Sequence, residues 1–387
     1  MGMRSSRSRF GYLYFAGLLL AFHYCFVVYI NSTFLSGFFS QRMVTTLYSL
    51  GAILSLTGLI LSPRLLRRFG NYHLTLWAIF IEITALFALT SLTHPVAVGI
   101  AFVIHIAMPL LLSFGLDIFL ERAIENEKHT GAIRSNYLTI INLGFVLSPL
   151  FIGKIISLTS LRAAYAFSAG FAIILLFVVI ERFSGVHARK FREVNFTDSI
   201  RKFAGRKNLS TVYWIHFVLQ CFFALMIIFT PLYLNTVIGF SWETIGAIFT
   251  FMLLPFILFE VPLGRYFDKI RGEKDALIIG FILISIACLT MFFLETKLAI
   301  VWAAVLFLSR TGASFVEIGT EYAFFRHVSD EDAGFISVYR TTQPVSFLIA
   351  PLVAGIVLST GVGINYVFLV IGLIVPIGAA LAYKLKR

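Results

Sequence analysis

Six side chains that can carry charge, exchange protons or form hydrogen bonds lie deep inside long apolar segments of this sequence. Such groups are costly in a hydrocarbon environment, so those found there usually bind a solute, bind an ion or pair with one another. We therefore treat all six as candidate substrate or coupling residues. They are His23, Glu82, His105, His216, Gln220 and Arg310.

The candidate groups offer two kinds of chemistry. Arg310 stays protonated at physiological pH, so it needs a carboxylate, a cluster of carbonyl groups or an anionic solute beside it. An internal ion pair is the alternative to a substrate or coupling role. His23 and His105 can exchange a proton near neutral pH, which suits proton coupling, or they are hydrogen-bonded fillers. Glu82 should be protonated or paired, and it could be the coupling acid.

The elements that must position these groups are membrane-spanning helices. Hydrophobic residues make up 59% of the 387 positions and charged residues 13%, whereas soluble chains carry about 25% charged residues. A helix needs about 20 mostly apolar residues to cross a bilayer. Twelve segments qualify, which predicts an all-α, multi-pass integral membrane protein. They are 11–32, 42–62, 73–93, 95–120, 134–158, 162–182, 211–234, 243–263, 275–294, 297–325, 334–358 and 363–384.

The distribution of basic residues predicts the orientation of the spans. If the N-terminus is cytoplasmic, 25 of the 31 Lys and Arg residues fall on the cytoplasmic side, four fall outside, and two lie within spans. Because cytoplasmic loops are enriched in Lys and Arg, both termini are expected in the cytoplasm. The same rule accounts for the net charge of +12, so it excludes a nucleic-acid partner.

The two halves of the chain repeat one another at an offset of 202 residues. This constant offset indicates two homologous six-helix units, and parallel repeats of this kind place a substrate site between the halves of a transporter. Matching pairs are Gly37-Phe38 with Gly239-Phe240, Gly70 with Gly272, Ser135 with Ser337, and 148–153 with 350–355.

A polar, basic segment at 183–209 separates the halves, which gives an N-terminal half at 1–182 and a C-terminal half at 210–387. Phe196, Ile200 and Phe203, with Phe191 before them, are spaced roughly as one helical face. This favours either an amphipathic helix on the anionic inner leaflet or a solvated linker.

The end of the eighth span carries a specific motif. Its residues resemble the signature G-x-x-x-D-[RK] of the major facilitator superfamily, which is followed by a basic turn with glycine. The matching residues are Gly264, Asp268, Lys269 and Gly272. The corresponding place in the first half keeps the basic residues and Gly70 but has Leu66 in place of the aspartate.

The resemblance implies a cytoplasmic lock between the halves. Asp268 is expected to meet the start of the fifth span near Arg134, where a helix presents its positive N-terminus. Two further acidic pairs, each spaced i, i+4 on one helical face, favour an intracellular ion-pair network over proton carriage. These pairs are Asp117 with Glu121, and Glu317 with Glu321.

The fifth and eleventh spans contain small residues and proline. The segment with Gly144, Pro149 and Gly153 is similar to a motif of antiporters in the family, with Ser148 where a glycine belongs. Pro351 and Gly355 occupy related places in the eleventh span, so a general helix-packing role is the alternative.

The resemblance implies a secondary transporter working by alternating access, in which the first, fourth, seventh and tenth helices line the cavity. The bacterial efflux-type members are the most similar, and the expected location is the inner membrane. We expect a monomer that moves a small organic solute with a proton or ion gradient. The alternatives are an importer of a sugar or organic anion and a transport-inactive sensor or scaffold.

Several function classes are not supported by the sequence. The first span has no acidic residue, which points away from cationic drugs and toward neutral or anionic solutes. The three cysteines lack metal-ligand spacing, and no nucleotide-binding loop or nucleophilic triad is evident. We therefore expect no cofactor, no metal and no enzymatic activity.

Overall fold

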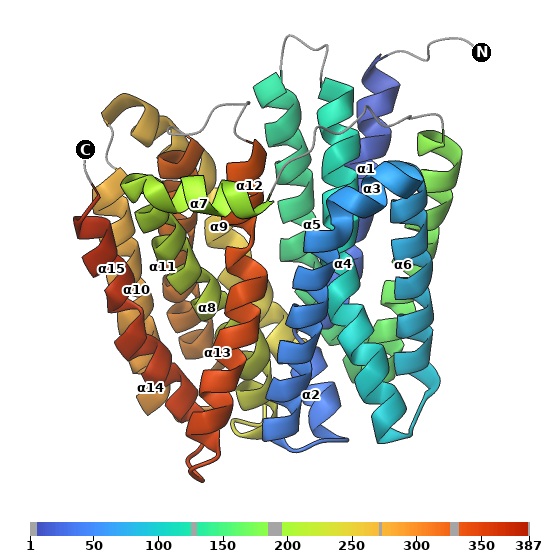
Figure 1. Ribbon diagram of the computed structural model, residues 1–387. Coiled ribbons are helices and arrows are strands. Elements are labelled where there is room, and N and C mark those ends of the chain that lie inside the picture. The colour runs from blue at the N-terminus through green and yellow to red at the C-terminus, as the bar shows by residue number, and fades with distance from the viewer. Residues whose placement is uncertain (1–5, 125–129, 185–195, 271–272, 326–332, 386–387) are drawn as a thin grey trace. The chain divides into compact units, whose positions relative to one another are not determined.

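The computed structural model describes residues 6–124, 130–184, 196–270, 273–325 and 333–385, and within these ranges it contains helices and turns but no strand. The helices are labelled in Figure 1. They are α1 (Ser6–Val28), α2 (Asn31–Ser36), α3 (Gln41–Ser91), α4 (Pro95–Ile124), α5 (Thr130–Leu158), α6 (Leu161–Phe183), α7 (Phe196–Gly205), α8 (Lys207–Thr236), α9 (Trp242–Ile270), α10 (Glu273–Phe293), α11 (Ala299–Phe325), α12 (Ala333–Arg340), α13 (Thr342–Leu358), α14 (Asn365–Ile374) and α15 (Pro376–Tyr383).

Twelve stretches of the described chain are long and apolar enough to cross a membrane, which confirms the number predicted. The second and third spans, Gln41–Ser62 and Arg64–Ser91, form one long helix, α3. Its only non-helical residue is Gly70, at φ 76°, a backbone conformation that glycine adopts without steric cost. The eleventh span is interrupted at Thr341, between α12 and α13.

The chain forms two compact units. Unit 1 comprises Met1–Asn31 and Leu50–Glu193, and unit 2 comprises Ser32–Ser49 and Val194–Arg387. Each unit is described here by itself.

In unit 1, α1 packs against α4, α5 and α6. The approach of α5 is close because a Cβ atom added to Gly144 would lie 2.8 Å from the Cβ of Ala21. Small residues at such crossings let helix backbones approach each other. Ala21 lies two residues before His23, so this crossing helps to fix the height of His23 in the unit.

In unit 2, α11 packs against α9 and α10. The crossing with α10 is the tighter, because a Cβ atom added to Gly280 would lie 2.6 Å from the backbone oxygen of Gly312. A backbone atom cannot rotate away as a side chain can, so this crossing needs glycine on α10. It holds α11, the helix of Arg310, in place.

The linker contains a short helix, as one of the two alternatives drawn from the sequence predicts. Figure 1 shows α7 running across the ends of the longer helices of unit 2. Phe203 is buried among Phe324, Phe335 and other apolar residues of α8, α11 and α12, while Ile200 is 45% exposed. The aromatic face of α7 is therefore partly docked on unit 2. Phe191 lies outside the described residues.

Candidate functional site

Three of the six candidate residues meet in unit 1. His105 on α4 has Nδ1 2.6 Å from Oε1 of Glu82 on α3. His23 on α1 has Nε2 3.2 Å from the same oxygen. The three side chains are at most 2% exposed. We call this set the His23–Glu82–His105 cluster.

The positions of the cluster residues follow from helix lengths. Glu82 lies nine residues before the end of α3, and His105 lies ten residues after the start of α4. At a rise of about 1.5 Å per residue, both lie at a similar depth below the short α3–α4 connection. Helix α1 packs against α4 and brings His23 to the same level. Glu82 was expected to be protonated or paired, and it is paired.

Helix α6 supplies two residues that the sequence analysis did not identify. The Ser168 hydroxyl lies 2.8 Å from Nδ1 of His23 and donates to the backbone oxygen of His23 at 2.8 Å. The Tyr165 hydroxyl donates to Oδ1 of Asn31 at 2.7 Å, and the Tyr165 ring packs edge-on against His105. A buried serine inside an apolar helix was the available signal, but many such serines bond only to their own helix.

The contact between His23 and Glu82 depends on whether a hydrogen lies between them. A bare ring nitrogen and a carboxylate oxygen repel each other at 3.2 Å, whereas a proton between His23 Nε2 and Glu82 Oε1 makes the contact favourable. The proton can reside on His23 or on Glu82, and the cluster holds the same total number of protons in both cases. Protons of such coupled groups belong to the set and not to one residue. The cluster can therefore hold and release one proton.

Arg310 lies in unit 2, on α11, and is 2% exposed. Its guanidinium carbon lies 5.0 Å from the ring centre of Phe222 and 5.4 Å from that of Phe223, both on α8. Aromatic faces stabilise a cation electrostatically without accepting its proton. Arg310 thus brings a permanent charge into the apolar interior of unit 2.

His216 and Gln220 lie one turn apart on α8, in a separate polar group. Thr342 donates its hydroxyl proton to the backbone oxygen of Tyr339 at 2.8 Å, so it accepts from Nδ1–H of His216 at 2.7 Å. Nε2 of His216 can then accept from the Gln220 amide at 3.1 Å. Both nitrogens of neutral His216 are satisfied, which describes a structural histidine better than a proton carrier.

Most of the predicted lock residues cannot be placed. Gly272 lies outside the described residues. The backbone of Gly264 is described as part of α9, but its surroundings are not. The described part also leaves out four side chains, those of Asp268, Lys269, Glu121 and Arg134. Of the acidic pairs, Asp117 and Glu317 are half-buried and Glu321 is exposed. The lock therefore stays a prediction.

Two of the predicted packing residues, Gly144 and Gly355, lie at close contacts between helices. Pro149 and Pro351 are inside α5 and α13, and Gly153 is buried. A Cβ atom added to Gly355 would lie 2.7 Å from the Thr45 hydroxyl, within unit 2. These contacts agree with a packing role in both spans, and nothing in them is particular to an antiporter.

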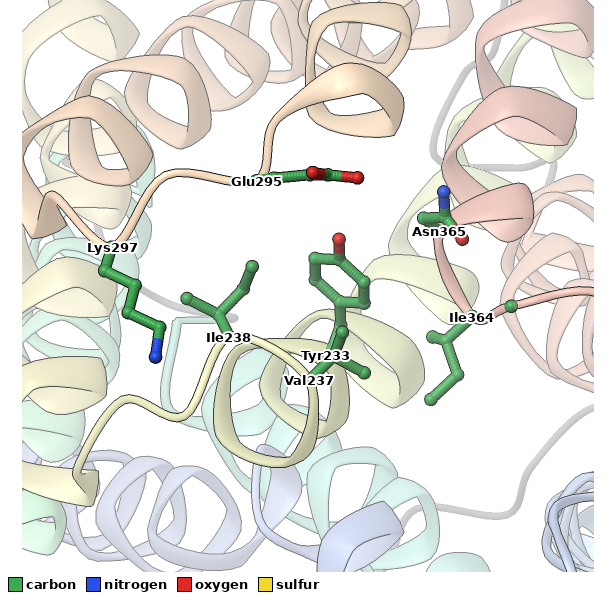
Figure 2. A pocket seen from close by; sticks show the side chains of 8 residues that line it. Tyr233, Val237, Ile238, Glu295, Lys297, Ile364 and Asn365 are labelled. Carbon is green, nitrogen blue, oxygen red and sulfur yellow. The ribbon is translucent and has the colours of Figure 1, made fainter.

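A pocket of about 300 Å³ lies at one end of unit 2, and none of the predicted site residues lines it. Figure 2 shows the Tyr233 ring at its centre, with Glu295 and Asn365 on one side and the Lys297 side chain directed away from Glu295. It combines one acidic and one basic side chain. Among the described residues, no group of three or more His, Cys, Asp or Glu side chains has the geometry of a metal site.

Comparisons with known proteins identify the architecture. Residues 239–387 match the model of the family described as Major Facilitator Superfamily. No curated protein is similar enough in sequence to match the chain.

Solved structures of transporters match almost the whole chain. The nucleoside transporter NupG has a TM-score of 0.74 at 12% identity, covering 99% of this chain and 100% of that one. A POT family transporter in complex with 5-aminolevulinic acid has a TM-score of 0.78 at 12% identity, covering 98% and 96%. A peptide transporter POT in complex with sulfate has a TM-score of 0.74 at 14% identity, covering 98% and 93%. The expected all-α fold with twelve membrane-spanning helices is thereby confirmed.

Proposed function

We propose that this chain, whose residues 239–387 match the model of the Major Facilitator Superfamily, is a member of that family and a proton-coupled secondary transporter of a small organic solute. The coupling proton binds to the His23–Glu82–His105 cluster. The observation that carries the proposal is the convergence of both histidines on one oxygen of a fully buried carboxylate. A buried titratable set of this kind in a membrane protein marks an ion or proton site more often than a purely structural contact.

The cluster links protonation to helix position. When it releases its proton, it leaves a buried negative charge, and the lone pairs of His23 Nε2 and Glu82 Oε1 face each other. Both effects favour an arrangement in which α1 moves away from α3. A ligand shifts a conformational equilibrium by its differential affinity for the two states, and here the proton is that ligand. Protonation thus favours the closed arrangement of unit 1.

The solute is proposed to contact Arg310 in unit 2. The faces of Phe222 and Phe223 stabilise the guanidinium of Arg310 and leave its positive charge in place. The planar fork of N–H donors in arginine suits carboxylate and phosphate groups. We therefore propose neutral or anionic organic solutes as the substrate class.

For the direction of transport we propose export in exchange for protons, on the partial match of Gly144 and Pro149 to the antiporter motif. The proposed setting is a monomer in a bacterial inner membrane with both termini in the cytoplasm. An importer of a sugar or organic anion is tested by the same experiment, because the sign of the pH gradient that drives uptake distinguishes the two directions.

The test uses the full chain in proteoliposomes with a pH-sensitive dye inside. Pools of neutral and anionic solutes, including nucleosides and short peptides, are presented under pH gradients of either sign. We expect one or more pools to move protons, and we expect Glu82→Gln to reduce this movement strongly. An exchanger takes up solute when the lumen is acidic, whereas a proton symporter does so when the outside is acidic.

Two outcomes would overturn the proposal. Solute uptake that is the same with and without a pH gradient would remove proton coupling. Proton movement that persists unchanged in Glu82→Gln would remove the cluster from the pathway. Glu295→Gln is the matched control, because Glu295 is an exposed carboxylate of the pocket in unit 2.

A further inference from the structure

We propose that Ser168 is a positioning residue that fixes the tautomer of His23, so that Nε2 is the nitrogen through which His23 exchanges the proton with Glu82. This inference rests on the proposed function. It adds a residue on α6, a helix that contributes no titratable group to the His23–Glu82–His105 cluster.

Three contacts determine where the hydrogen of His23 lies. The Ser168 hydroxyl is 2.8 Å from the backbone oxygen of His23 and 2.8 Å from its Nδ1. The backbone oxygen of Ser168 is 3.3 Å from the same Nδ1. Both residues are fully buried, so these contacts are not exchanged for contacts with bulk water.

Nδ1 of His23 must carry a hydrogen in this arrangement. A carbonyl oxygen can only accept, so the Ser168 hydroxyl donates to the backbone oxygen of His23 and accepts from Nδ1–H. The opposite choice would place a bare Nδ1 beside the carbonyl oxygen of Ser168 and a bare hydroxyl oxygen beside the carbonyl of His23. Two repulsive contacts would replace two favourable ones.

The position of Nδ1–H decides what Nε2 can do. In neutral His23, Nε2 has a lone pair, and it lies 3.2 Å from Glu82 Oε1. On His23 itself the next proton can bind only at Nε2. Ser168 therefore determines that protonation closes the contact between α1 and α3 and that proton release opens it. Without Ser168 the other tautomer could place Nε2–H toward Glu82 with no added proton, and the contact would lose its dependence on protonation.

The groups that face His23 come from three helices. They are Glu82 from α3, His105 from α4 and Tyr165, beyond His105, from α6. The pH response of the cluster therefore depends on these groups and on the hydrogen bond from Ser168.

The experiment compares Ser168→Ala with Ser168→Thr, which keeps the hydroxyl. The control is Ser148→Ala, because Ser148 is also fully buried but its hydroxyl donates only to Gly144 of its own helix. The first readout is the pH at which proton-driven flux is half-maximal. The second is the tautomer of His23 in protein labelled with ¹⁵N-histidine in nanodiscs, read by NMR and assigned with His23→Asn.

In Ser168→Ala we expect the half-maximal pH to move toward acid by about half to one unit, which corresponds to losing one hydrogen bond of ordinary strength. The direction follows because an acceptor at Nδ1–H stabilises the charged imidazolium more than the neutral ring. The NMR spectrum at high pH should change from the Nδ1–H tautomer to a mixture. Ser168→Thr and Ser148→Ala should resemble the wild type.

A wild-type pH profile and tautomer in Ser168→Ala would overturn the inference and leave the proposed function intact. If Ser168→Ala does not fold, wild-type protein with an Nε2–H tautomer at high pH would overturn it equally. Wild-type flux that ignores the pH gradient would instead overturn the proposed function, and the inference would fall with it. The two failures are therefore distinguishable.

Discussion

The two repeated halves carry their buried charges at different places. At the offset of 202 residues, His23 corresponds to Leu225 and Glu82 corresponds to Ile284, both buried apolar residues of unit 2. His105 corresponds to Phe307. In the other direction, Arg310 corresponds to Met108, which is buried in unit 1.

This asymmetry separates what the repeat determines from what it does not. The shared pattern of apolar spans gives both units the same kind of helical scaffold. The units differ at these positions, with the titratable His23–Glu82–His105 cluster in unit 1 and a permanent cation in unit 2. Under the proposed function, unit 1 responds to protons and unit 2 responds to the solute, and we call this the division of labour.

The largest expected effect is that of Glu82→Gln on the response of unit 1 to protons. The amide cannot take up a proton, so proton-driven transport should fall by about 5- to 150-fold, the usual range of a coupling free energy. Exchange of solute without a gradient should be largely retained. Measurement of both fluxes in the same proteoliposomes checks this, and equal losses of the two would contradict the division of labour.

Arg310→Ala should have the complementary effect in unit 2. Losing a hydrogen bond to a charged group weakens solute binding by about tenfold to a hundredfold, whereas the protonation of Glu82 should not change. Binding of a solute identified in the flux screen measures the first effect, and the infrared carboxyl band of Glu82 over a pH titration measures the second.

Arg310→Lys sharpens this test, because it keeps the charge but not the planar fork. An intermediate affinity is expected. If the infrared titration of Glu82 shifts in Arg310→Ala, then the charge of Arg310 influences the protonation of Glu82. The two units would then not have separate roles.

A histidine in each unit gives a smaller contrast. His23→Asn should make transport insensitive to pH over the range in which the wild type responds. His216→Asn should leave the pH profile unchanged, because neutral His216 already satisfies both ring nitrogens through Thr342 and Gln220. It should lower stability by about 1 kcal/mol per lost hydrogen bond. Flux over a pH series and thermal unfolding test this, and a pH shift in His216→Asn would return His216 to the coupling candidates.

The smallest expected effects concern the tight helix crossings. Gly280→Ala should destabilise the protein by about 1–3 kcal/mol, the usual cost of overpacking, because its Cβ would meet a backbone atom of Gly312. Gly144→Ala should cost less, since it meets the Ala21 and Leu18 side chains first. Gly170→Ala is the control, with nothing within 4 Å. Thermal unfolding in detergent measures the loss of stability in each of the three variants. Equal losses in Gly280→Ala and Gly170→Ala would contradict the predicted order.

Most of the fold could be predicted from the sequence, because span length, charge distribution and an internal repeat are properties of the chain alone. The depth of His23, Glu82 and His105 could be predicted for the same reason. Their convergence on one oxygen could not, since it depends on the rotation of α1, α3 and α4 about their axes. Helices that are apolar on all sides carry no hydrophobic face that reports this rotation.

The contributions of Ser168 and α7 were missed for a related reason. A serine in an apolar helix commonly bonds to a carbonyl of its own helix, as Ser148 does, and only the packed structure distinguishes the two cases. The aromatic residues of α7 could equally face lipid or protein, and the position of Phe203 depends on the apolar surface that α8, α11 and α12 offer.

The complete burial of the His23–Glu82–His105 cluster has a consequence for energy conservation. With no more than 2% of any of its side chains exposed, a bound proton has no direct contact with water on either side of the membrane in this conformation. Protons cannot then cross merely by binding and leaving, and each one must wait for a rearrangement of the helices. Under the proposed function, this burial prevents the carrier from dissipating the proton gradient without moving its solute.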